Sequence, residues 1–191
     1  MTGRRWAAGL ALAAGIALLP AVVQSQDAKQ RTKCEEATQL FRATDRDMAK
    51  FFDDAVGYAI FPSVGKGAFI VGGAAGTGCL YESGALVGQA KLVQVTVGLQ
   101  LGGQSYAEII FFQTHDAIES FKSSNFEMSA QLSAVAAASG ASANAKYELG
   151  VLVFTIAKGG LMYEASVGGQ KFTFKPLKEP SSGDAPEQEK D

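Results

Sequence analysis

The chain has few of the residues on which metal and catalytic sites usually depend. Its 191 residues include 1 His, 2 Cys and 1 Trp. A zinc site needs several Cys, His or acidic ligands at close spacing, and neither Cys34 nor Cys79 has partners at such a spacing. We therefore expect no metal and no cofactor.

The single histidine also restricts the possible catalytic arrangements. Residues 103–107 (GQSYA) approximate the G-x-S-x-G nucleophile elbow, which needs a strand–turn–helix followed by an acid and then a histidine. Strand-like sequence follows Ser105, and His115 is interpreted as a surface residue at a helix start. The carboxylate pairs 35–36 and 53–54 are interpreted as solvated helix faces. The sequence predicts a protein that is not an enzyme.

Basic residues are not in excess. The chain has 17 Lys and Arg against 19 Asp and Glu, and the net charge without Arg4 and Arg5 is −4. Nucleic-acid-binding proteins usually have a strong basic excess on one face. We therefore expect no nucleic acid among the partners.

A long apolar run occurs only near the N-terminus. Arg4 and Arg5 precede apolar residues from Ala7 to Val23, and this run is short for a membrane-spanning helix, which needs about 20 residues. The pattern predicts a signal peptide over residues 1–25, cleaved between Ser25 and Gln26, with an uncleaved anchor as the alternative. The protein is then periplasmic or secreted, and peripheral to a membrane.

The two cysteines allow more than one interpretation. Lys33 precedes Cys34 and Gly78 precedes Cys79, so neither has the small-residue lead of a lipidation site. Export would permit a Cys34–Cys79 disulfide. The alternative, which the sequence favours slightly, is two separate buried cysteines.

Helical periodicity is confined to two regions. Apolar residues spaced by three and four predict two short helices, over about 33–43 and 45–56, with capping boxes at Thr32 and Thr44. Residues 114–123 (THDAIESFKS) predict a further short helix.

Most of the remaining chain is strand-like, with glycine between the segments. Residues 92–101 alternate with period two, with Val93 on one side and Gln94 on the other, which predicts a half-buried strand. Residues 126–137 alternate in the same way and are assigned to a strand despite their helix-forming composition. The other strand candidates are YAIF, AFIVGG, GCLYES, YAEIIFF, GVLVFTIA and LMYEASVGG. The tail 176–191 is expected to be disordered.

The glycine-rich stretch 61–78 (FPSVGKGAFIVGGAAGTG) matches neither common phosphate-binding motif. Phe61 stands where a Walker loop has its first glycine, and Tyr81 stands where a dinucleotide fingerprint has its third. We predict that Gly65 and Gly67 turn the chain. The later glycines are expected to allow bulges and close backbone approach in a sheet.

These elements predict one α+β domain over residues 26–175. N-terminal helices precede a largely antiparallel, curved, glycine-rich sheet or sandwich with one inserted helix.

Four segments together resemble the SYLF domain in order and spacing, over about residues 36–174. They are AVGYAIFPSVGKGAFIVGGAAGTGCLY, VGLQLGGQSYAEIIFFQTHDAIESF, FEMSAQLSAVAA and YELGVLVFTIAKGGLMYEASVGG. The resemblance implies a lipid-binding module, exported in bacterial members. The chain lacks the lipobox, SH3 domain and FYVE domain of various relatives, so actin or endosomal roles are not expected.

The resemblance favours a phospholipid membrane surface, with an anionic or phosphoinositide-type head group, as the partner. The candidate lipid-binding residues are Lys66, between two glycines, and Arg42, Arg46 and Lys50, four residues apart. The residues alone favour a solvated helix face for the last three, because acidic side chains are interleaved with them. The alternative function is a structural protein of the cell envelope that binds a protein partner.

Overall fold

The computed structural model describes residues 19–67, 71–97, 104–124, 126, 128, 134–158 and 169–177. The helices in these residues are α1 (Leu19–Thr44), η1 (Arg46–Met48), α2 (Ala49–Asp54), α3 (His115–Lys122) and η2 (Ala141–Asn144). The strands are β1 (Gly57–Gly67), β2 (Val71–Glu82), β3 (Ala85–Val97), β4 (Gln104–Phe112), β5 (Val135–Ala136), β6 (Val151–Lys158) and β7 (Gln170–Pro176). Helices come first and α3 interrupts the strands, which confirms the α+β prediction.

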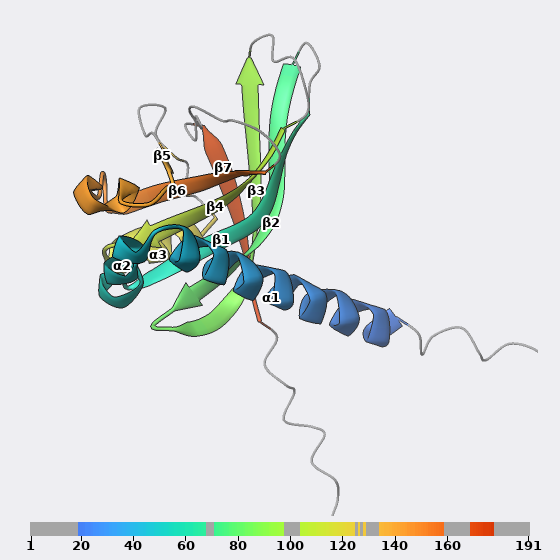
Figure 1. Cartoon of the computed structure of the whole chain (residues 1–191). Helices are drawn as coiled ribbons and strands as arrows, with labels where there is room; N and C mark the ends of the chain where they lie inside the picture. The colour runs from blue at the N-terminus through green and yellow to red at the C-terminus, as the bar shows by residue number, and fades with distance from the viewer. Residues whose placement is uncertain are drawn as a thin grey trace, which may run out of the picture.

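The described strands form one seven-stranded sheet in the order β5-β6-β4-β1-β2-β3-β7 (Figure 1). The short β5 pairs parallel with β6, and the other pairs are antiparallel. A largely antiparallel sheet is therefore confirmed, and within the described residues it is a single sheet rather than a sandwich.

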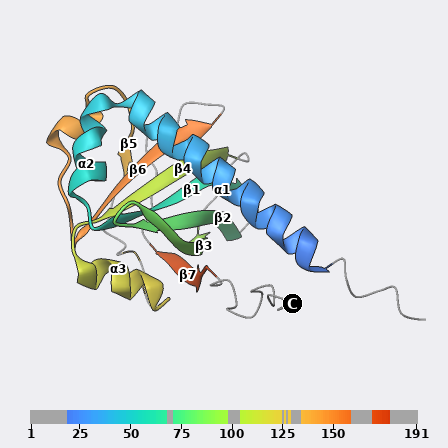
Figure 2. The same ribbon diagram turned by 90° about the horizontal axis from the view of Figure 1, so that it is seen from below.

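The sheet curls until its β7 edge approaches β4, although three strands separate the two in the sheet order. Gln170 of β7 donates from Nε2 to Glu108 Oε2 at 2.9 Å and to Tyr106 Oη at 3.3 Å, and both acceptors belong to β4. These contacts define an inner, concave face. α3 lies on this side, while α1 and α2 lie along the opposite, outer face (Figure 2).

Period-two alternation gives the sheet one apolar core on each face. The inner core includes Ile110 and Phe112 of β4, covered by Ile118 and Phe121 of α3. The outer core contains aromatic and aliphatic residues of α1, α2 and the strands beneath them: Phe41, Phe51, Ile60, Ile109, Phe111 and Phe154. The inserted helix predicted over 114–123 is confirmed as α3, with Thr114 as its N-cap.

The N-terminal helix is longer than the sequence predicted. α1 begins at Leu19 rather than near residue 33, because no proline or glycine interrupts residues 21–44. Thr32 does not cap a helix there, since its hydroxyl donates within the helix to the Ala28 carbonyl. Among the described residues, no helix is both long and apolar enough to cross a membrane.

A disulfide joins α1 to the sheet. Cys34 of α1 and Cys79 of β2 are bonded, with their Cα atoms 6.2 Å apart. The sequence left this pairing open and slightly favoured two separate cysteines. The bridge forms because the outer core brings these two buried residues together.

The break between the first two helical regions is confirmed, but Asp45 rather than Thr44 is the cap. Asp45 Oδ1 accepts from the amide of Asp47 at 3.1 Å, and Oδ2 accepts from the amide of Ser142 at 2.8 Å. Burial raises the pKa of Asp45, but these amide hydrogen bonds outweigh it and hold the pKa below its ordinary value. A single carboxylate therefore ends α1 and ties η1 to η2.

A bulge explains how a proline fits into the central strand β1. Phe61, Pro62 and Ser63 lie opposite only Thr77 and Gly78 of β2, since the register shifts between Ile60 and Val64. The bulge gives β1 one extra residue, so Pro62, which has no backbone N–H, fits into the strand. A Cβ on Gly78 would collide with the Ile60 carbonyl oxygen, which confirms the predicted close approach.

The half-buried strand predicted over 92–101 buries the side that carries Gln94. Its alternation is correct in β3, but Gln94 is 1% exposed and Val93 is 53% exposed. Gln94 faces the inner side, where Gln170 lies opposite it in β7. The inner face is polar at this level, and this environment reverses the usual assignment of valine inside and glutamine outside.

Of the strand predicted over 126–137, only part lies in the described residues. Phe126 and Met128 are not in a strand, residues 135–136 form β5, and residues 125, 127 and 129–133 lie outside the described part. Met128 is buried all the same, and its amide donates to the Gln170 carbonyl. The LMYEASVGG candidate also lies outside the described residues, except for Gly169, which is in a turn.

Candidate functional site

The outer faces of β3 and β7 carry a row of exposed basic side chains. Register pairs Val93 with Lys171 and Lys91 with Thr173, and Lys175 follows on the same side of β7. All five are exposed, while Leu92 and Phe172, which alternate with them, are buried. We call the surface of Lys91, Val93, Lys171, Thr173 and Lys175 the basic face.

Neutral residues and one carboxylate border the basic face. Ala75 and Thr77 of β2 are exposed next to β3. Gln89 of β3 donates to Asp27 Oδ1 of α1 at 2.8 Å, so this carboxylate lies at the margin. No acidic side chain projects from β3 or β7 onto this face within their described residues, so three lysines give it a positive potential.

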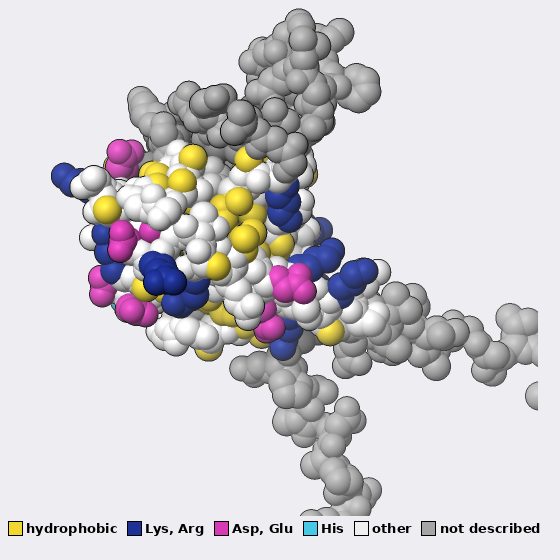
Figure 3. Space-filling view, in the orientation of Figure 1, with side chains coloured by type: hydrophobic (Ala, Val, Ile, Leu, Met, Phe, Trp, Pro, Cys, Tyr) yellow, Lys and Arg dark blue, Asp and Glu magenta, His cyan; other side chains and the backbone are white. Residues whose placement is uncertain are grey.

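The basic residues predicted near the helices do not form one stripe. The break at Asp45 places Arg42 in α1, Arg46 in η1 and Lys50 in α2. All three are exposed, but the Arg42 guanidinium lies 3.8 Å from the centre of the Phe52 ring and Lys50 donates to the Ala143 carbonyl. On the face that carries α1, Lys and Arg lie in separate groups with Asp and Glu between them (Figure 3).

The sequence predicted a turn around Lys66, but the structure places Lys66 in a strand. β1 continues through Gly65, Lys66 and Gly67, and Lys66 pairs with Ala74 of β2 and Gln104 of β4. Both neighbouring strands pair with this backbone, so the turn predicted at Gly65 and Gly67 is not present. The Lys66 side chain lies outside the described part of the structure.

A groove of about 380 Å³ lies between α1 and the outer face of the sheet. Its apolar lining comes from Ala37 and Leu40 of α1, Pro62 of the β1 bulge and Ala107 of β4, and its polar lining comes from Lys33, Glu36, Ser63 and Lys158. The alanines leave the space that larger side chains would fill. We call this feature the α1 groove.

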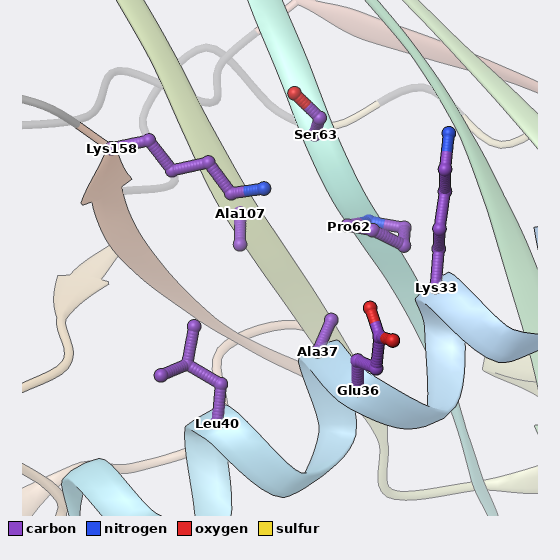
Figure 4. Close-up of a pocket in the computed structure, with 8 residues that line it drawn as sticks. All are labelled: Lys33, Glu36, Ala37, Leu40, Pro62, Ser63, Ala107 and Lys158. Carbon is purple, nitrogen blue, oxygen red and sulfur yellow. The ribbon is translucent and has the colours of Figure 1, made fainter.

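The two lysines lie on opposite sides of the α1 groove. Lys158 reaches over Ala107 from the end of β6, and Lys33 rises from α1 on the far side of Pro62 (Figure 4). Among the described residues, neither lysine forms an ion pair, although Glu36 follows Lys33 by three positions. Two cations and one carboxylate leave the groove with a net charge of +1 above an apolar floor.

A buried polar cluster occupies the inner face. Tyr106, Glu108 and Gln170 are each 0% exposed, and Gln94 lies beside them on β3. Burial, and then the charge of Glu108, raise the pKa of the Tyr106 hydroxyl above its ordinary value. Hydrogen bonds of this kind hold β4 and β7 in one arrangement. The cluster therefore shapes the curl that presents the basic face.

The serine of the elbow-like motif lies within a strand. Ser105 belongs to β4 and pairs with Lys158 of β6 and Gly65 of β1, whereas a nucleophile elbow places its serine between a strand and a helix. His115 is exposed at the first position of α3.

Sequence reasoning missed β7 and with it most of the basic face. The signal was present in QKFTFKP, where Lys171, Thr173 and Lys175 alternate with Phe172 and Phe174. The alternation was overlooked because the segment adjoins the Pro-, Ser- and Glu-rich tail. The groove lysines were also not predicted as site residues, because Lys33 and Lys158 line the same groove only when α1 lies across the sheet.

Comparison with known proteins identifies the C-terminal part of the chain. Residues 93–176 match the Ysc84 family model, described as "Las17-binding protein actin regulator". Beta cell expansion factor A of Aeromonas veronii is 26% identical over 122 residues, which cover 63% of this chain and 46% of that protein. The chain thus spans less than half the length of this relative. The segment from the second half of β3 to the end of β7 is thus similar to the Ysc84 (SYLF) family.

Proposed function

We propose that this protein is an exported, non-catalytic lipid-binding protein that attaches to anionic membrane surfaces. The similarity of residues 93–176 to the Ysc84 (SYLF) family suggests an actin- or lipid-related role. Export favours the lipid role. The predicted signal over residues 1–25 supports export, as does the Cys34–Cys79 disulfide, because such bonds persist mainly in oxidising compartments.

The basic face is the observation that carries the proposal. Lys91, Lys171 and Lys175 project from the same side of two paired strands, so a flat anionic surface contacts them together. Each lysine near an anionic bilayer contributes about 1 kcal/mol, so the three contribute about 3 kcal/mol. The exposed Val93 among them adds a small apolar contact.

Sedimentation with liposomes tests this proposal. We expect the protein to bind vesicles of phosphatidylcholine and phosphatidylglycerol but not phosphatidylcholine alone. Added salt should weaken binding, since charges are screened over about 8 Å at physiological ionic strength. Replacing the three face lysines with Gln should weaken binding by roughly 100-fold, because about 1.4 kcal/mol corresponds to tenfold. Equal binding to both vesicle types would refute the proposal.

The helical basic residues provide a matched comparison in the same assay. Replacing Arg42, Arg46 and Lys50 with Gln removes the same charge from the surface beside α1. We expect a smaller loss, because Arg42 and Lys50 already contact Phe52 and the Ala143 carbonyl. Lys66→Gln tests the remaining sequence-based candidate. A loss from the helical triple alone would move the membrane contact to the helices.

An envelope protein partner is the second candidate. A sheet edge is the natural place for such a partner, but the β7 edge carries Lys171, Lys175 and Pro176, which discourage strand addition. The described part of this edge therefore favours the lipid surface. Retention of the protein by envelope proteins in the absence of lipid would reverse this preference.

A further inference from the structure

We infer that the α1 groove binds one molecule of a single-chain anionic amphiphile, a fatty acid. This site is separate from the basic face, and the inference does not depend on attachment to a membrane. It rests on the shape of the groove, its apolar floor and the two lysines beside it.

The shape of the groove suits one narrow apolar chain. Its volume of about 380 Å³ is near the lower end of small-molecule sites, which span roughly 300–1,000 Å³. A single acyl chain fits such a space better than the two chains of a phospholipid. The helix α1 forms one wall and the sheet forms the floor, so the chain lies between two secondary-structure layers.

The apolar lining of the groove is largely buried, and Leu40 is its exposed part. Ala37, Pro62 and Ala107 present only small hydrocarbon groups, and Leu40 of α1 points towards the groove (Figure 4). Leu40 is 42% exposed, which makes it one of the few large apolar side chains exposed in the described structure. Burial of the exposed part of the Leu40 side chain by a hydrocarbon chain is favourable, at about 25 cal/mol per Å².

The charges define the head group. Lys33 and Lys158 lie on opposite sides of the groove and form no ion pair with another described residue. A carboxylate between them would gain two cationic partners, whereas a quaternary ammonium would meet repulsion. Glu36 lies in the same lining and opposes an anion, so its charge should limit the affinity.

Isothermal titration calorimetry with dodecanoate, kept below its micelle-forming concentration, tests the inference on the disulfide-bonded protein. We expect binding with 1:1 stoichiometry. Dodecyltrimethylammonium, which has the same chain and a cationic head, should bind far more weakly. Lys33→Gln and Lys158→Gln should each weaken dodecanoate binding by about fivefold, and Glu36→Gln should strengthen it by about threefold.

Two variants test the apolar floor. Ala107→Leu should fill the groove and abolish binding, and a melting curve establishes that it is folded. Leu40→Ser changes an exposed side chain, so it should fold normally and still weaken binding.

Lys175→Gln on the basic face is the matched control. It should leave dodecanoate binding unchanged while weakening binding to anionic liposomes, and Lys158→Gln should do the reverse. Failure of the liposome assay alone would refute the membrane proposal and leave the groove site intact. The groove site would be overturned if dodecanoate did not bind, whether or not vesicles did. It would also be overturned if the cationic amphiphile bound equally well, or if the parent and the groove variants had equal affinities.

Discussion

The outer face of the sheet has two halves with opposite surface chemistry. Under α1 and α2, strands β1, β4 and β6 present large apolar side chains such as Ile109, Phe111 and Phe154. On β3 and β7, the same side of the sheet presents Lys91, Val93 and Lys171 to solvent. We call these the covered half and the bare half.

The difference shows that helix coverage, rather than strand propensity, decides which side chains a strand presents. All these strands alternate with period two, but only the covered half has a helical layer to receive its outward side chains. The bare half keeps small, polar or basic residues on its outer side and buries the inner ones. The two halves therefore separate a packed surface from a solvent-exposed one, and the following substitutions test this separation.

Removing the disulfide should cause the largest loss of stability. Cys34 and Cys79 are 45 positions apart and join α1 to β2. For a loop of this length, the loss of chain entropy corresponds to about 4 kcal/mol. We expect Cys34→Ser with Cys79→Ser to lower the Tm by roughly 12 °C, since 1 kcal/mol shifts the Tm by about 2–4 °C at this size. An unchanged Tm would mean that packing alone holds α1 in place.

Truncation of an aromatic residue in the covered half should have nearly as large an effect. The Phe111 ring lies 4.9 Å from the Phe52 ring and 5.8 Å from the Phe51 ring, measured between centroids. Phe111→Ala removes a fully buried ring and should cost about 3–4 kcal/mol in the free energy of unfolding. Chemical denaturation measures this loss. A cost below about 1 kcal/mol would contradict the account of the covered half.

Asp45 tests a polar contribution to the stability of the covered half, because its carboxylate links two segments there. Asp45→Ala leaves the Ser142 amide without its carboxylate acceptor and should cost about 2–3 kcal/mol at neutral pH.

The pKa of Asp45 gives this cost a pH dependence. The pKa is lowered in the folded protein from an ordinary value of 3.8, so the stabilisation is complete above that value and is lost as the pH falls through the folded pKa. The difference in stability between parent and variant should therefore shrink in acid. A difference that stays constant down to pH 2 would assign the effect to packing.

Val93→Ala in the bare half should have the smallest effect. Val93 is 53% exposed and has no helix above it, so the free energy of unfolding should change by less than about 0.5 kcal/mol. The same denaturation assay compares it directly with Phe111→Ala. Similar losses in the two variants would remove the distinction between the halves.

Much of the fold could be predicted because its signals are local. Alternation of side chains predicted β3, and strand-like runs separated by glycine predicted β4 and β6. The spacing of Ile118 and Phe121 predicted α3. The break after Thr44 was also predicted, although the residue that caps η1 was not. These signals depend on neighbours within a few positions, which a sequence displays directly.

The surroundings of the predicted site residues differ from those expected, for a different physical reason. Arg42, Arg46 and Lys50 are evenly spaced in sequence, but a short-range cap at Asp45 divides them among three elements. Lys66 looked like a turn residue, whereas pairing on both sides holds its backbone in a strand. In both cases the basic residues are where the sequence has them, but the structural surroundings predicted for them were wrong.

By itself, the sequence determined the residue types, the order of elements and the inward–outward alternation along each strand, because these follow from backbone geometry over short distances. The tertiary structure alone decided which side of β3 is buried, whether Cys34 meets Cys79, and how Lys33 and Lys158 come to lie beside the same groove. Each of these depends on the curl of the sheet or on the position of α1 across it. Such contacts join residues far apart in the chain, and no local pattern records them.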